Sequence, residues 1–203
     1  MASVGNTAIT AIDVKNEYRL ELFLDGKSPV AEAPDVKTLD QVRERMIDRV
    51  LLDQEARASD IKVADDDKAV DQRVEGIRNR FQSAASYQDG LQALHMTEAD
   101  LRQDLAEQEA ILQLIDQRLR PEATVEPAEI ETYYRDTFVP QLARQGEQPP
   151  PLTNVTDRIR EILVQQKING LLEDWLRRLR AAREVKTYGS AEAEAASPGR
   201  TPE

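Results

Sequence analysis

Apolar residues recur at helical spacing over most of this chain. The segment over residues 35–59 places them every three or four positions, as the buried face of an amphipathic helix requires: Leu39, Val42, Met46, Ile47, Val50 and Leu51. Residues 98–120 repeat the pattern with Leu101, Leu105, Leu112, Ile115 and Leu119, after a capping box of Thr97 and Asp100. Comparable patterns predict further helices within residues 11–24, 63–81, 86–96, 125–138 and 156–184.

Two short segments have β character instead. Residues 3–10, SVGNTAIT, read as a hairpin turning at Gly5 and Asn6, and residues 184–188, EVKTY, alternate like one strand. Because an unpaired strand edge is costly, we expect the C-terminal strand to pair with the N-terminal hairpin. The predicted fold class is mainly α, a multi-helix domain with a small β element formed by the hairpin and that strand.

This organisation predicts one domain over residues 1–188. Its N-terminal part spans residues 1–136, a proline-rich bridge spans 137–153, and a returning helix and strand span 154–188. Gly170, inside the returning helix, is expected to mark close packing against a neighbour. Residues 189–203 have low complexity and are expected to be disordered.

Charge and cysteine content narrow the classes of function. The net charge is −11, which argues against nucleic-acid binding because phosphate contacts need a basic face. No apolar run approaches the roughly 20 residues of a membrane helix, so no integral membrane segment is expected. The chain has no cysteine, which excludes disulfides and thiol catalysis.

Candidate catalytic and metal-binding groups are sparse. His95 is the single histidine, and its place at a helix end favours a turn residue over a catalytic base. Asp65, Asp66 and Asp67 lack the spacing of a calcium loop and are better explained as helix caps. Tyr133 and Tyr134 are expected to divide between core and rim. We therefore expect no catalytic residue, no metal and no cofactor.

The remaining signal is the set of apolar stripes. Most of these residues should form the core, yet long helices joined by loops leave grooves that suit peptide segments. The larger and more adaptable side chains are the candidates for lining such a groove. The predicted peptide-binding residues are Phe23, Met46, Phe81, Tyr87 and Met96.

The order of segments resembles the SurA-type periplasmic chaperones, which are related to parvulin-type prolyl isomerases. The resemblance rests on VGNTAITAIDVKNEYRLELFL, on IDRVLLDQEARASDIKVADDDKAVDQRVEGI, on MTEADLRQDLAEQEAILQLIDQRL and on VEPAEIETYYRD, which occur in the family's order. Members usually carry parvulin domains after the tyrosine pair, where this chain has only residues 137–153. Seventeen residues are too few for such a domain.

The resemblance implies an ATP-independent periplasmic chaperone, or holdase, that binds unfolded or outer-membrane client polypeptides without prolyl isomerase activity. It also implies a signal peptide that this sequence does not show. Two alternatives stay open at this point: a structural module that binds one dedicated envelope partner, and a degenerate prolyl isomerase. Exchange of terminal strands or helices between two copies would give a homodimer.

Overall fold

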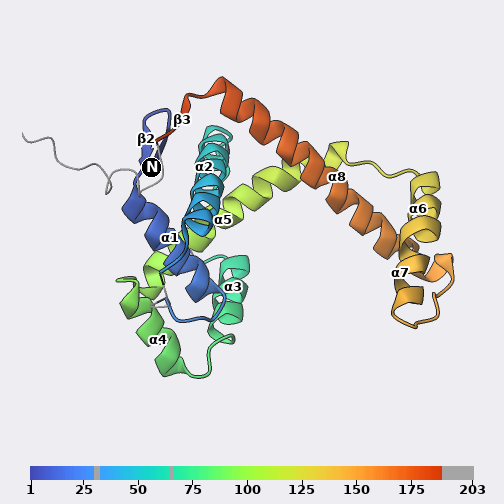
Figure 1. The fold of residues 1–203 in the computed structure, drawn as a ribbon, viewed down its shortest axis with the longest axis horizontal. Helices are drawn as coiled ribbons and strands as arrows, with labels where there is room; N and C mark the ends of the chain where they lie inside the picture. The colour runs from blue at the N-terminus through green and yellow to red at the C-terminus, as the bar shows by residue number, and fades with distance from the viewer. Residues whose placement is uncertain (30–32, 65, 189–203) are drawn as a thin grey trace, which may run out of the picture. The chain divides into compact units, whose positions relative to one another are not determined.

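The computed structural model describes residues 1–29, 33–64 and 66–188 and is mainly helical, as predicted (Figure 1). The chain forms two compact units: Met1–Leu114 with Arg178 onward, and Ile115–Arg177. The single domain expected over residues 1–188 stays a prediction, and the expected disorder of residues 189–203 lies outside the described residues.

The first unit contains five helices that begin at polar caps. These are α1 (Ala11–Leu24), α2 (Val36–Ala58), α3 (Lys68–Arg78), α4 (Ala84–Ala93) and α5 (Glu98–Leu119), the last of which continues into the second unit. Thr10, Asp35, Asp67 and Ser83 each accept a hydrogen bond from a backbone N–H of the first turn. Asp67 is thus a helix cap, as predicted, whereas Asp65 lies outside the described residues.

The sheet joins the two ends of the chain. Strands β1 (Ala2–Val4), β2 (Thr7–Ile9) and β3 (Val185–Thr187) pair antiparallel in the order β2-β1-β3, with Val4 opposite Thr7 on one side and Val185 on the other. Figure 1 shows β3 beside the N-terminal hairpin. The hairpin packs against α2, which buries Ala2, Val4 and Ile9. The predicted pairing of the lone C-terminal strand is confirmed.

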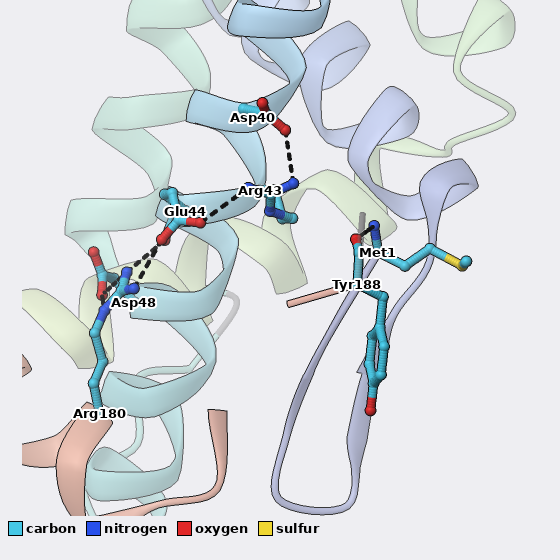
Figure 2. A network of polar contacts seen from close by, with 7 residues as sticks. All are labelled: Met1, Asp40, Arg43, Glu44, Asp48, Arg180 and Tyr188. Atoms are coloured by element: carbon cyan, nitrogen blue, oxygen red, sulfur yellow. Dashed lines mark hydrogen bonds and ion pairs between the residues drawn. The ribbon is translucent and has the colours of Figure 1, made fainter. Parts of the chain in front are cut away.

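Two arginines fasten the returning helix to α2. Arg180, at the end of α8 (Leu152–Ala182), donates from Nε to Asp48 Oδ1 and from Nη1 to Glu44 Oε2, each at 2.8 Å (Figure 2). Burial alone would raise the pKa of the Glu44 carboxyl, but hydrogen bonds from Arg180 and Arg43 outweigh it and hold that pKa below its ordinary value. Arg183 adds hydrogen bonds of 2.6 Å to Gln54 and to Glu55.

One apolar core cluster of the first unit gathers residues from α1, α3, α4 and α5. Its buried members are Leu20, Phe23, Val70, Val74, Ile77, Tyr87, Leu91, Leu101, Leu105 and Ala106. On α1, Leu20 and Phe23 are buried while Leu22 and Leu24 are only half-buried. On α5 the expected burial of Leu112 is wrong: Leu112 is 52% exposed and Leu114 is buried instead.

The ends of α2 and α4 share one backbone motif. After α4, His95 N–H donates to Gln92 O and Met96 N–H donates to Leu91 O. These two hydrogen bonds define a Schellman motif. His95 takes the left-handed conformation that the motif requires, with φ of 55°. The exposed His95 is therefore a turn residue, as predicted.

The second unit is built from short helices around α8. These are η1 (Arg120–Glu122), α6 (Pro127–Tyr133), the π-helical turn η2 (Tyr134–Phe138) and α7 (Val139–Arg144). Ile130, Val155 and Ile159 form their buried core, and both tyrosines of the pair pack against it. Tyr134 stacks on Phe138, with ring centroids 6.0 Å apart, and its hydroxyl donates to Pro150 O at 2.7 Å.

The proline-rich bridge over residues 137–153 stays a prediction; helix α7 lies inside this range, and α8 begins at Leu152. One expectation for this part of the chain is corrected. Gly170 is exposed, and a Cβ built there would meet no atom within 4 Å, so it does not mark close packing. None of the helices in the described ranges combines the length and the hydropathy of a membrane-spanning segment.

Replacing Arg180 by alanine should lower the free energy of unfolding by about 1–3 kcal/mol, because Glu44 and Asp48 lose charge-assisted hydrogen bonds. The measurement is urea unfolding at pH 7. Arg177→Ala is the matched control, since Arg177 makes only an exposed pair with Asp174 and should cost less than about 0.5 kcal/mol. Equal losses for the two variants would contradict this role for Arg180.

Replacing Gly90 by alanine should lower the free energy of unfolding by about 1–3 kcal/mol. A Cβ at position 90 would lie 2.7 Å from two carbons of the Phe23 ring, which is fully buried and has no room to turn. Gly76→Ala is the control: no atom lies within 4 Å, so removing a helical glycine should stabilise by about 0.5–1 kcal/mol. Thermal unfolding of both variants gives the comparison.

Candidate functional site

The structure brings four of the five predicted peptide-binding residues into one cluster. The centroid of the Phe23 ring lies 5.0 Å from that of Phe81 and 5.5 Å from that of Tyr87. The ring centroids of Phe81 and Tyr87 are 5.7 Å apart. Met96 packs against the same cluster, whereas Met46 is half-buried on α2 outside it. Phe23 and Tyr87 are 0% and 1% exposed, so they hold the core together beneath the surface.

Phe81 is the ring of this cluster that reaches a surface hollow. The hollow measures about 340 Å³ and lies between the end of α1 and helix α4, where Phe81 and Gly90 meet Ser86 and Asp89. Its apolar floor continues into the buried rings, because the Phe23 ring lies directly under Gly90. The peptide-binding role of the five residues stays a prediction.

A larger groove lies between α2, the segment that follows it, and α5. Its volume is about 670 Å³. The groove is lined by Asp53, Ala56, Arg57, Ile61, Lys62, Val63, Ala99, Asp100, Gln103, Ala106, Glu107 and Ala110. None of these residues was among the sequence candidates. The available signal was the spacing of Ala99, Ala106 and Ala110, which places small side chains along one face of α5.

The floor of the groove is made of small buried side chains. Ala56, Ala106 and Ala110 are 2%, 5% and 7% exposed. Because alanine ends at Cβ, a bound segment can approach the two helices closely along this floor. Ala99, at the exposed end of the groove, and Ala110 are eleven residues apart, so the groove runs for about 16 Å along α5.

The side wall of the groove is set by the Schellman motif that ends α2. Asp60 N–H donates to Arg57 O, Ile61 N–H donates to Ala56 O at 3.0 Å, and Asp60 has a φ of 53°. This motif is commonly accompanied by an apolar contact across the helix end. The Schellman motif reverses the chain direction after α2, so that Ile61 and Val63 line the groove beside the alanine floor.

The charges at the rim are unevenly compensated. On the α2 side, Arg57 pairs with Asp53 and Lys62 pairs with Asp60, each at 3.0 Å. On the α5 side, hydrogen bonds from the backbone and the hydroxyl of Thr97 lower the pKa of Asp100, which therefore stays ionised. Glu107 has no ion pair among the described residues.

An ion triad connects α1, α2 and α5 one helical turn before Asp53. The Arg49 guanidinium lies between Glu17, at 3.3 Å, and Asp104, and it also feels the charge of Glu107. Burial raises the pKa of the Glu17 carboxyl above its ordinary value of 4.5, and the charge of Asp104 adds to the rise against the attraction of Arg49. One cation is thus shared by several carboxylates.

The arrangement suits binding better than catalysis. In the described part of the chain, no group of three or more histidine, aspartate or glutamate side chains is placed to hold a metal. The groove offers apolar floor, mixed polar rim and open access, which are the features of a site for a polypeptide segment.

The raised pKa of the Glu17 carboxyl predicts how the unfolding free energy depends on pH, including the sign of the change. Since its pKa is raised in the folded state, the native protein binds this proton more tightly than the unfolded chain. The stabilisation from this group is therefore full below about pH 4.5 and is lost as the pH rises through the raised pKa. Glu17→Gln should lack this contribution, so the difference in unfolding free energy between variant and parent should change between pH 4.5 and 7.

Urea unfolding of both proteins across this range measures the effect. Asp25→Asn, at an exposed position, serves as the control and should show no comparable change. A constant difference between parent and Glu17→Gln would show that Glu17 titrates normally.

The comparisons with known proteins agree with this architecture. A family model described as the SurA-like N-terminal domain matches residues 1–115, which include α1 to most of α5 and the whole groove. A search of curated proteins finds no match. Because the matched residues make up more than half of the 203-residue chain, it belongs to the family of SurA-like N-terminal domains.

Proposed function

We propose that this protein is an ATP-independent holdase that binds unfolded polypeptide clients in the groove between α2 and α5. The observation that carries the proposal is the position of the groove: all its lining residues, from Asp53 to Ala110, fall inside the part of the chain that matches a chaperone-like helical family. The groove belongs to the first unit alone, so it needs no contribution from residues 115–177.

The chemistry of the groove supports broad selectivity. Burying apolar surface stabilises a complex by roughly 25 cal/mol for each Å², whatever the sequence of the client. The floor presents alanine methyl groups and few polar anchors, so it discriminates weakly between apolar segments. The groove length of about 16 Å along α5 accommodates about five residues of an extended client.

The smaller hollow at Phe81 would hold a second part of the same client. In this proposal Phe81 contacts the client directly, while Phe23 and Tyr87 keep the Phe81 ring in position. The family's usual compartment makes the periplasm the proposed location and outer-membrane polypeptides the proposed clients. We propose no prolyl isomerase activity, because neither hollow contains a group suited to that chemistry.

Filling the groove should weaken holdase activity. Gln103 is exposed at the rim, so Gln103→Trp should fold normally yet place an indole over the alanine floor. The assay is light scattering of an unfolded outer-membrane protein diluted into buffer with equimolar chaperone. The parent should suppress aggregation, and Gln103→Trp should reduce the suppression at least about threefold, a loss of about 0.7 kcal/mol of binding.

Gln117→Trp is the matched control, because Gln117 is exposed on the same helix and does not line the groove. It should suppress aggregation as the parent does. No suppression by the parent at any ratio would reject the holdase proposal. Equal activity of the two tryptophan variants would reject the groove as the client site.

A further inference from the structure

We propose that the groove between α2 and α5 selects client segments that carry lysine or arginine next to their apolar residues. This inference rests on the proposed function and adds the chemical class of the client. It follows from how the charges around the groove are distributed.

The groove and the ion triad beside it hold more carboxylates than cations. The carboxylates are Glu17, Asp53, Asp100, Asp104 and Glu107, and the cations are Arg49, Arg57 and Lys62. Each cation already has a carboxylate partner within 3.3 Å. The excess charge of the site is therefore negative, and each of its cations is already engaged by a carboxylate rather than open to an anionic client.

Two carboxylates that make no ion pair among the described residues lie on one rim. Asp100 and Glu107 are seven residues apart on α5, so they stand about 10 Å apart on the same face with Gln103 between them. Both line the groove whose floor is Ala106 and Ala110. An apolar segment lying on this floor would thus pass two carboxylates along one side.

Two alternatives for the occupant are less favourable. An anionic apolar segment would be repelled by the same rim. A second copy of this chain carries a net charge of −11, so its approach is opposed by long-range repulsion. A cationic client is instead attracted at long range and positioned by the rim at short range.

The experiment compares three fluorescent peptides that share one apolar core of five residues. Their flanking residues are two lysines, two glutamines or two glutamates, and fluorescence anisotropy gives the dissociation constants with the full chain. At low salt the lysine peptide should bind about 3–10 times more tightly than the glutamine peptide, and the glutamate peptide more weakly than both. At about 0.5 M salt the three constants should converge, because the rim is exposed to screening.

The double variant Asp100→Asn with Glu107→Gln should remove most of the preference for the lysine peptide over the glutamine peptide. Asparagine at position 100 keeps an oxygen that can accept from Thr97, and Glu107→Gln alone should show part of the effect. The control is Glu122→Gln with Glu131→Gln, which changes the net charge equally at exposed positions that do not line the groove. That control should retain the lysine preference.

Equal binding of the three peptides would overturn the proposed charge selectivity and leave the holdase proposal intact. A preference lost equally in the control variant would also overturn it, since the effect would then come from net charge alone. Failure of every peptide to bind would overturn the proposed client site itself. Sedimentation of the full chain with and without peptide measures its oligomeric state. A dimer that forms through the groove and that peptide does not dissociate would overturn that site as well.

Discussion

The pairing of β3 with β1 is the constraint on which the first unit depends. The hairpin has only three residues in each strand, and an isolated two-stranded hairpin of this size is at best marginally stable in water. The third strand satisfies the free edge of β1, and α2 covers the apolar side. Hydrogen bonds from Arg180 and Arg183 hold the end of α8 against α2. This contact places β3, which follows α8, beside β1.

The helices and strands of this fold could be predicted from the sequence because each is marked by turn residues, capping residues or an apolar pattern within its own segment. Gly5 and Asn6 mark the hairpin, Thr97 and Asp100 mark the start of α5, and the alternation of EVKTY marks β3. Burial on α1 and α5 was harder to assign. Leu112 and Leu114 are equally apolar, and only the packing of neighbouring helices decides that Leu114 is buried.

The candidate site was not readable in the same way. Large aromatic residues were expected at a groove, yet Phe23 and Tyr87 are buried in the apolar cluster, because aromatic side chains contribute a large apolar area to a core. The groove is instead floored by alanines, whose sequence signal is weak. Its wall depends on Asp60 in a left-handed conformation, which is unusual for a residue other than glycine.

The sequence distance between β1 and β3 has a consequence for how this protein is made. The two strands lie more than about 180 residues apart, closing such a loop is entropically unfavourable, and the final strand leaves the ribosome last. The apolar cluster of the first unit and the groove use residues 20 to 110 only. Local helix contacts form much faster than such distant ones. The surface between α2 and α5 can therefore assemble on the growing chain before its two ends have met.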